Sequence, residues 1–370
     1  MRYWFHRMFP WLSGLMVVVT VFTATLGALW FIPVRWSASS LLITPGMSER
    51  GIAQRVASAN VSYPAWLTTL LVRSFGGRST VHYGEYRLNE MMSLSQLLTH
   101  LKDQSGLVQH HVTLIEGWTF AQIKRALLHD DALNHSMLSG SNASLLKAIG
   151  VDATHPEGLF YPDTYHYVWG SSALRILKRS HQLMNQVLQK AWEKRATGLP
   201  YQTPYEALIV ASMIEVESPT LSERPLIAGV ILERLKKGMR LQIDPTVLYG
   251  AGKLFGSPIT KKDLATITPY NTYRQSGLPP TPIDMPSRSS IEAALHPINK
   301  GYLYYVSNGD GTHTFSTTYA KHQQGVARYR KIEQQRKQLE HLPLSSSLPI
   351  LKFEWQRVMM RSLQWFILNG

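Results

Sequence analysis

Residues 205–246 read YEALIVASMIEVESPTLSERPLIAGVILERLKKGMRLQIDPT, and this stretch decides how the rest of the chain is interpreted. It opens as an apolar helix in which Leu208, Ala211 and Glu215 recur at roughly helical spacing on one face. A glutamate that continues a buried face rarely lacks a partner or a task. Pro219 ends this helix, because the residue before a proline is displaced from α geometry.

Two carboxylates stand close to the end of this helix. Glu217 follows Glu215 by two residues and therefore points roughly 200° around the helix, at about 100° per residue. The pattern predicts that only one of them serves a given cleft. A carboxyl group at a helix end, set partly in an apolar wall, tends to hold its proton near neutral pH. A general acid needs that property, and we predict Glu215 for this role.

The second half of the stretch predicts another helix and then an extended segment. Ser222 is a plausible N-cap for the helix, and Gly238 marks its end. In the extended segment 239–246, strand alternation places Gln242 and Asp244 on one side, where they join Glu215 as candidate cleft residues. The alternative for Asp244 is a turn cap before the following proline, which is the commoner role of an Asp-Pro pair.

The chain carries a set of motifs that resembles the YceG-like family, the membrane-anchored endolytic murein transglycosylases. The resemblance runs in the family's order over roughly residues 40–330. The motifs are IEGWT (115–119), EGLFYPDTY (157–165), SMIEVES (212–218), SER (222–224), GVILERL (229–235), GMRLQIDPTVLYG (238–250), PYNTY (269–273), GLPPTPI (277–283), YLYYV (302–306) and HTFSTT (313–318). The departures are Ile243, where a small hydroxyl residue is usual, Thr281, where glycine is usual, and DMPS (284–287), which replaces an Asn-Pro-Gly-like turn.

The resemblance implies a lytic transglycosylase that acts on peptidoglycan and ends the elongation of glycan strands. Glu215 would protonate the β-1,4 glycosidic oxygen between N-acetylmuramic acid and N-acetylglucosamine. It would then accept the proton of the substrate's own C6 hydroxyl, which leaves a 1,6-anhydro end without adding water. The predicted substrate-binding residues are Gln242, Asp244, Asn271, Tyr273 and Glu217. The expectation includes no metal and no cofactor.

The N-terminus predicts a membrane anchor. Residues 11–32 carry no charge and are long enough to cross a hydrocarbon core of about 30 Å. Trp11 and Trp30 stand at the ends of this run, and Arg2 and Arg7 precede it, which favours a cytoplasmic N-terminus. The alternative is a cleaved signal peptide, but the run exceeds a typical apolar region of about 7–15 residues. The expected location is the bacterial inner membrane, with the body of the chain in the periplasm.

Composition limits the class of protein and of partner. The chain has 370 residues, of which 44% are hydrophobic and 17% charged, as in a globular protein of about two domains. It has no cysteine, which excludes thiolate catalysis and Cys-ligated zinc. The net charge of +14 suggests an anionic partner. An exported chain meets lipid headgroups and the cell wall, so we predict these partners, with peptidoglycan synthases as further candidates, and no nucleic acid.

The predicted fold class is α+β. The N-terminal residues 1–10 are followed by the transmembrane helix, a tether (33–43), a small LysM-like α/β module (44–110), a mixed α+β catalytic domain (111–340) and a C-terminal extension (341–370). The LysM-like module either grips glycan chains or acts as a spacer. The extension carries tryptophans among basic residues and suits an interfacial helix or an irregular tail.

Two other functions remain open on the sequence. One is a hydrolysing muramidase that uses Glu215 with Asp244 or Glu217, since glycosidases normally need two carboxylates about 5–9.5 Å apart. The other is a non-enzymatic protein that binds the wall and anchors a synthase complex. Products lighter by one water separate the transglycosylase from the muramidase, and retention on peptidoglycan without released fragments would indicate the wall-binding protein.

Overall fold

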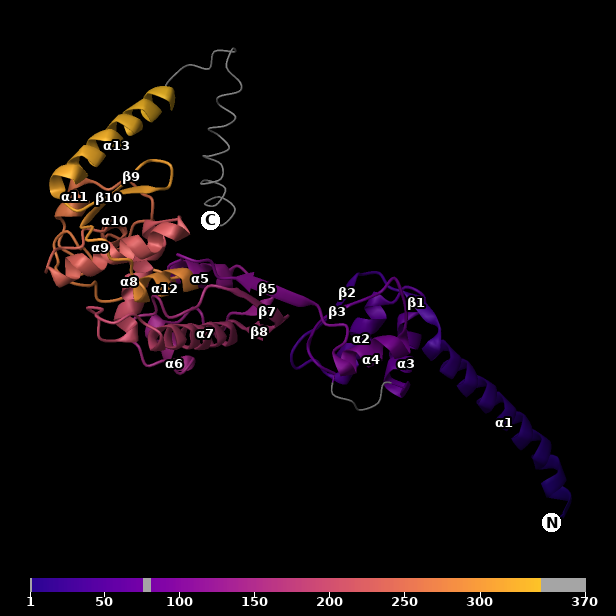
Figure 1. Cartoon of the computed structure of the whole chain (residues 1–370). Coiled ribbons are helices and arrows are strands. Elements are labelled where there is room, and N and C mark those ends of the chain that lie inside the picture. Colours follow the sequence, from indigo (N-terminus) through magenta and orange to yellow (C-terminus); the bar gives the residue numbers. More distant parts are fainter. Residues whose placement is uncertain (1, 76–80, 341–370) are drawn as a thin grey trace. The chain divides into compact units, whose positions relative to one another are not determined.

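The computed structural model describes residues 2–75 and 81–340, which fall into two compact units (Figure 1). Unit 1 comprises residues 1–112, 130–136 and 166–173, and unit 2 comprises 113–129, 137–165 and the chain from 174 onward. The chain passes between the units within β5 (Gln109–Thr113) and β7 (Thr164–Val168). The mixed α+β class is confirmed, while the predicted extension 341–370 lies outside the described residues.

Unit 1 begins with the apolar helix α1 (Arg2–Phe31), which leads directly into its body (Figure 1). Its remaining elements are β1 (Pro33–Arg35), β2 (Ser40–Ile43), α2 (Glu49–Ala59), α3 (Ala65–Phe75), β3 (Gly84–Arg87), β4 (Met91–Ser93), α4 (Leu94–Asp103), β6 (Leu133–Asn134) and β8 (Ser171–Ser172). β1 pairs with β4 and β2 with β3, both antiparallel, and β6 pairs with β8 in parallel. β2, α2, α3 and β3 follow one another along the chain and form a βααβ unit, whose first strand lies before the predicted module 44–110.

The predicted tether is instead part of the folded body of unit 1. Residues 33–43 supply β1 and β2, and Val34, Trp36, Leu41 and Ile43 are buried in its core. The Trp36 indole donates a hydrogen bond of 3.0 Å to the carbonyl of Met92. The serines of this segment, at positions 37, 39 and 40, lie between two pairs of buried apolar residues, and these pairs belong to the core.

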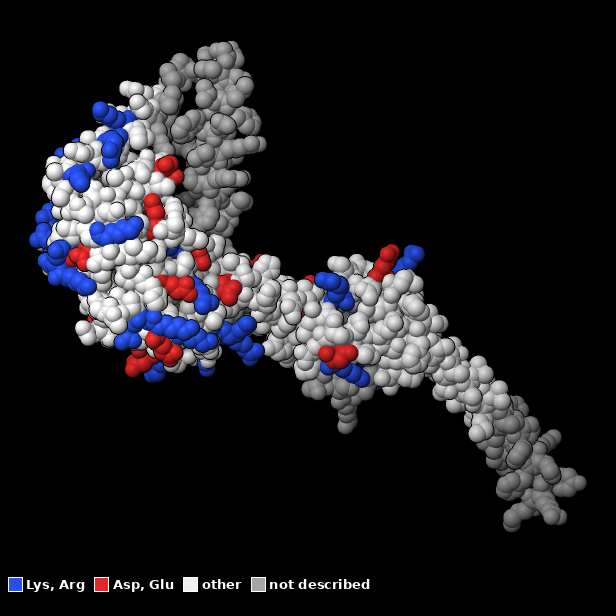
Figure 2. Space-filling model, in the orientation of Figure 1, with Lys and Arg blue, Asp and Glu red and all other residues white. Residues whose placement is uncertain are grey.

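Unit 2 is mainly helical. Its elements are α5 (Phe120–Leu128), α6 (Asn142–Ala148), α7 (Ala173–Glu193), α8 (Pro204–Glu217), the 3-10 turn η1 (Leu221–Glu223), α9 (Arg224–Lys236), α10 (Asp244–Gly250), α11 (Lys261–Ala265), α12 (Arg288–Leu295), β9 (Tyr304–Ser307), β10 (His313–Ser316) and α13 (Tyr319–Glu340). β9 and β10 form an antiparallel hairpin. On the face shown in Figure 2, lysine and arginine side chains gather along one edge of this unit.

The helix α8 is the centre of unit 2. Its start is set by the N-cap Thr203 with Pro204 in the first turn, and its end by Ser218 before Pro219, as predicted. Every residue from Ala207 to Glu215 is buried, so the helix is apolar around its whole circumference and is packed by neighbours on all sides. α9 and α12 are two of these neighbours.

The segment after α9 is not the predicted strand. Met239–Ile243 is irregular, and α10 begins at Asp244 with Pro245 in its first turn. Gln242 has a φ of 53°, in the left-handed region that a non-glycine residue seldom adopts. A left-handed residue breaks strand alternation, so Gln242 and Asp244 do not share a face in the way that the extended segment predicted.

Gly229 allows α9 to approach the chain before β9, and its replacement should destabilise unit 2. A Cβ at this position would collide with the backbone carbonyl oxygen of Ile298. We expect Gly229→Ala to lower the free energy of unfolding by about 1–3 kcal/mol, despite the better helix propensity of alanine. Gly51→Ala is the control, since its Cβ would meet the flexible side chains of Met47 and Ser48. Urea unfolding would measure both, and equal stability of the two variants would contradict this account.

Candidate active site

The two carboxylates at the end of α8, Glu215 and Glu217, lie in different surroundings. The predicted angular separation of Glu215 and Glu217 is confirmed, because the first contacts α9 and the start of α12 and the second faces Tyr305 of β9 and Asp244. Each is therefore judged by the groups that surround it.

Glu215 is held in a buried ion pair. Its Oε1 accepts a hydrogen bond of 2.8 Å from Arg224 Nη2, and its Oε2 accepts one of 3.1 Å from Arg224 Nη1. Both residues are buried, with 9% of Glu215 and 5% of Arg224 exposed. A bidentate pair of this kind fixes the carboxylate in orientation as well as in position.

The start of α12 completes the surroundings of Glu215. The backbone N–H of Ser287 donates to Glu215 Oε2 at 2.8 Å, and the Ser287 hydroxyl lies 2.5 Å from the same oxygen. Ser287 is also the N-cap of α12, so the carboxylate lies at a helix N-terminus, where negative charge is favoured. Glu215 thus joins α8, α9 and α12. Both of its oxygens accept hydrogen bonds from these donors, whereas Gln242 contacts Arg234 and Asp244 contacts Tyr273.

Glu217 has the surroundings that a general acid needs. Burial, opposed by a hydrogen bond with the Tyr305 hydroxyl and reinforced by the nearby charge of Asp244, raises its pKa from 4.5 to about 7. Its Oε2 is enclosed and has no hydrogen-bond partner. A carboxyl group that holds its proton near neutral pH can act as a general acid.

A buried arginine stands beside Glu217. Arg234 of α9 is 7% exposed, and it donates to the carbonyl oxygens of Leu303 at 2.6 Å and Leu241 at 2.7 Å. Its guanidinium carbon lies 5.2 Å from the centre of the Tyr304 ring. These contacts hold a positive charge near Glu217, and this charge opposes the rise of the Glu217 pKa.

The surroundings of Glu217 also include Asp244, Tyr273 and Gln242. The Tyr273 hydroxyl donates to Asp244 Oδ1 at 2.6 Å, and burial followed by this carboxylate raises the Tyr273 pKa. Gln242 Oε1 accepts from Arg234 Nη1 at 3.2 Å. Asp244 and Gln242 are exposed, so a polymer in solution can reach them. The strained φ of Gln242 is of a kind that collects at functional sites.

Asn271 does not fit its predicted role in binding. It is 1% exposed, and its Nδ2 donates to backbone oxygens of residues 263–266, with the shortest bond, 2.6 Å, to Thr266. Its Oδ1 accepts from the backbone N–H of Tyr273 at 3.0 Å. The side chain organises the loop that presents Tyr273, and it has no polar atom left for a substrate.

Unit 2 contains two further buried carboxyl groups, those of Asp284 and Glu157. Asp284 is fully buried with neither carboxylate oxygen bonded, and burial, then Glu215 and Glu157, raises its pKa well above the usual range. Burial also raises the pKa of Glu157 to about 8. Both groups are expected to be neutral at pH 7, which removes the repulsion that ionised forms would exert on the Glu215–Arg224 pair.

Sequence reasoning missed the arginines and Tyr305. No role was predicted for Arg224, Arg234 or Tyr305, although the three residues lie in the family motifs 222–224, 229–235 and 302–306. Membership of these motifs was the available signal. Among the described residues, no group of three or more His, Asp or Glu is placed to hold a metal ion.

Comparisons with known proteins agree with the motifs. The model of the YceG-like family matches residues 41–328. A protein of Bacillus subtilis strain 168, named endolytic murein transglycosylase, is 31% identical over 272 residues, which cover 69% of this chain and 75% of the relative. One of the same name from Streptococcus pneumoniae strain D39 is 28% identical, and the match covers 66% of this chain and 50% of that protein.

A solved structure is also similar. The crystal structure of a YceG-like protein from Listeria monocytogenes matches 77% of this chain and 97% of its own, with a TM-score of 0.52 and 28% identity. The family model covers most of the chain, including both units and the whole of the site described above. The chain therefore belongs to the YceG-like family.

Proposed function

We propose that this chain is an endolytic lytic transglycosylase of peptidoglycan and that Glu217 is its acid and base. The observation that carries the proposal is the contrast between the two glutamates. Glu215 is committed to Arg224 and Ser287, whereas Glu217 has a pKa near 7 and an oxygen without a partner. The names of the curated relatives support the reaction class.

In the first step Glu217 gives its proton to the glycosidic oxygen that follows N-acetylmuramic acid. The bond from C1 to this oxygen breaks, and positive charge develops at C1 and the ring oxygen. Tyr305 keeps its own proton, because burial and Glu217 raise its pKa, and its hydroxyl steadies the glutamate. Glu217 leaves the step as a carboxylate, which Tyr305 and the charge of Arg234 stabilise.

In the second step the C6 hydroxyl of the same sugar attacks C1, and Glu217 takes the proton of this hydroxyl. The product has a 1,6-anhydro bond, and the glutamate has regained its proton without consuming water. One carboxyl group thus suffices for both transfers, which is why its pKa must lie near the working pH. Asp244 with Tyr273, and Gln242 on its strained backbone, are placed to orient the sugars.

A hydrolysing muramidase remains the second candidate, since the charge of Asp244 acts on Glu217. In that case Asp244 would activate water or stabilise the sugar cation. Digestion of purified sacculi separates the two reactions by the mass of the new glycan ends. The transglycosylase releases ends lighter by one water, and the muramidase releases reducing ends. Binding to sacculi without any release would contradict both.

The proposal includes the single membrane anchor. Among the described residues, one helix, α1, is long and apolar enough to span a membrane, with the apolar window Gly14–Phe31. We propose that it spans the inner membrane with a cytoplasmic N-terminus, and that the βααβ unit is the LysM-like module. The fusion of a reporter to the C-terminus tests the topology. Recovery of a soluble chain that lacks the first thirty residues would indicate a cleaved signal peptide instead.

The rate of cleavage should fall as the pH rises through the pKa of Glu217. The acid form is the reactive one in the first step, and burial keeps it populated up to about pH 7. Above this value kcat/KM should fall by about tenfold per pH unit. Initial rates of fragment release between pH 5 and pH 9 would measure this, and a rate that does not change between pH 7 and pH 9 would contradict the assignment of the acid.

A further inference from the structure

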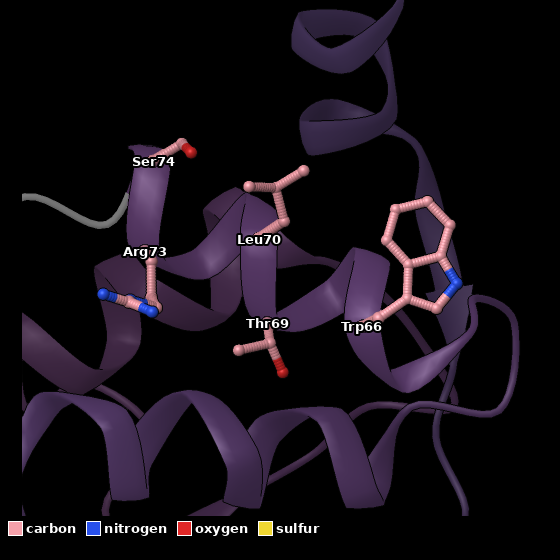
Figure 3. Close-up of a pocket in the computed structure, with 5 residues that line it drawn as sticks. All are labelled: Trp66, Thr69, Leu70, Arg73 and Ser74. Atoms are coloured by element: carbon pink, nitrogen blue, oxygen red, sulfur yellow. The ribbon is translucent and has the colours of Figure 1, made fainter.

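The outer face of α3 in unit 1 carries large exposed apolar side chains, although the inner face of the helix is already packed. Thr68, Leu71 and Val72 are buried, while Trp66 is 68% exposed and Leu70 is 41% exposed. Figure 3 shows both side chains on the hollow along α3, which is lined by Trp66, Thr69, Leu70, Arg73 and Ser74. Large apolar side chains exposed beside polar ones, on a helix whose other face is already packed, are typical of an interaction surface.

Bonds at both ends of α3 hold it at the last turn of α1. Before its start, the Tyr63 hydroxyl donates to the carbonyl of Leu29 at 3.2 Å. At its end, the Phe75 ring packs against Trp30 with 5.5 Å between ring centres. Leu29 and Trp30 lie in the last turn of α1, which is the proposed membrane span. Their contacts therefore hold α3 at the level where the span leaves the membrane.

Four further apolar side chains are exposed near the end of α1. Phe31, Ile32, Val61 and Met91 are exposed by 45% or more. Their positions are tied together, because Arg35 of β1 follows α1, pairs with Met91 and accepts the backbone hydrogen bond of Val61 at 3.1 Å. Exposed apolar groups that are continuous with a membrane span, rather than scattered singly, indicate an interaction surface.

The charges at this surface suit lipid headgroups. Arg73 and Arg35 are exposed among the apolar residues, and Glu90 is the acidic residue beside Met91. Tryptophan next to arginine is typical of the membrane interface, where the indole lies among headgroups and the guanidinium binds phosphate. Residues 14–31 of α1 include no charged side chain, and Figure 2 shows no blue or red atoms on the white part of this helix.

We infer that the outer face of α3 lies in the headgroup region of the membrane that α1 spans. The occupant of the face is the lipid surface, and the inference rests on the proposed span. Docking of α3 would give the βααβ unit a second contact with the bilayer besides α1 and would restrict its movement relative to the membrane. The glycan strands that this chain meets would then be those close to the membrane.

The absence of cysteine from the sequence allows a direct test with single labels. Ser74→Cys places an environment-sensitive fluorophore on the α3 face while Trp66 and Leu70 stay in place. Gln109→Cys is the control, at the exposed start of β5, away from α1 within unit 1 (Figure 1). Val18→Cys labels the span itself, where Val18 is 64% exposed. The full chain is reconstituted in vesicles of zwitterionic and anionic phospholipid, with and without brominated acyl chains.

The label at Ser74 should lose roughly half of its emission in brominated vesicles, because interfacial helices lie about 5–10 Å into the headgroup and acyl boundary. The label at Gln109 should be unaffected, and Trp66→Ser with Leu70→Ser should abolish the quenching at Ser74. A Ser74 label as open to aqueous iodide as Gln109 would overturn the inference. So would a label shielded from iodide but not quenched by lipid, which would indicate a second copy of the chain. A label at Val18 that brominated lipid does not quench would instead refute the proposed membrane span.

Discussion

Glu217→Gln is expected to abolish cleavage of peptidoglycan while the fold is kept. Loss of general acid–base catalysis typically costs a factor of roughly 10²–10⁴ in rate, or about 3–5 kcal/mol of barrier. We expect the upper end of this range, because one group serves both proton transfers. Glutamine keeps the size of the side chain and can still accept the hydrogen bond of Tyr305. The rate of release of soluble fragments from sacculi measures the effect, with Glu292→Gln on the surface of α12 as the control.

The same replacement should stabilise the chain at neutral pH. In the unfolded chain Glu217 ionises near pH 4.5, whereas in the folded chain it keeps its proton up to about pH 7. The folded state therefore loses stability as the pH rises from 4.5 to 7, and the loss persists above that window. Glutamine does not ionise, so Glu217→Gln should gain up to about 3–4 kcal/mol at pH 8 and little at pH 4, at about 1.4 kcal/mol per pKa unit. Urea unfolding at the two pH values would measure this, and equal gains would contradict the cause.

Breaking the Glu215–Arg224 pair should have the largest effect on stability. Glu215→Gln leaves the buried guanidinium without its counter-charge, and removal of one partner of a buried pair costs about 3–5 kcal/mol. Arg224→Leu should cost a similar amount, because the carboxylate then lies buried with only Ser287 as donor. The double variant should lose less than the sum of the two, since neither charge is left unpaired.

An exposed pair provides the comparison. Arg288 and Glu292 form a surface ion pair on α12 at 2.8 Å, with side chains 71% and 52% exposed. Glu292→Gln should change the free energy of unfolding by about 1 kcal/mol at most, because exposed pairs contribute little. Denaturant unfolding of the full chain in detergent would measure all the variants. Additive losses in the double variant, or a loss for Glu215→Gln no larger than that for Glu292→Gln, would contradict the ion-pair account.

The sequence was sufficient for features that short-range chemistry decides. The ends of α8 follow from Thr203, Pro204 and Pro219, and the hairpin of β9 and β10 follows from its glycine-rich turn. The angle between Glu215 and Glu217 follows from helix geometry alone. Gln242, Asp244, Glu217 and Tyr273 were predicted as site residues from the sequence. In the structure Tyr273 bonds to Asp244, the charge of Asp244 acts on Glu217, and Gln242 bonds to Arg234 beside Glu217.

What the sequence could not provide was the identity of each neighbour. Residues 207–215 of α8 are all buried, so the apolar pattern could not show which carboxylate meets a partner. The partners that decide this, Ser287 and Tyr305, come from segments about seventy to ninety positions further along the chain. The left-handed backbone at Gln242 likewise depends on its contacts with Arg234 and with the loop at Thr272.

The most direct test of the central claim compares the two glutamates in one assay. Purified wild type, Glu217→Gln and Glu215→Gln digest the same sacculi, each rate is divided by the folded fraction of the protein, and the products are identified by mass. Wild type should release 1,6-anhydro ends, and folded Glu215→Gln should keep substantial activity despite its lower stability. Glu217→Gln should release no fragments above background while it still binds the sacculi. Normal cleavage by Glu217→Gln, together with a well-folded but inactive Glu215→Gln, would contradict the account.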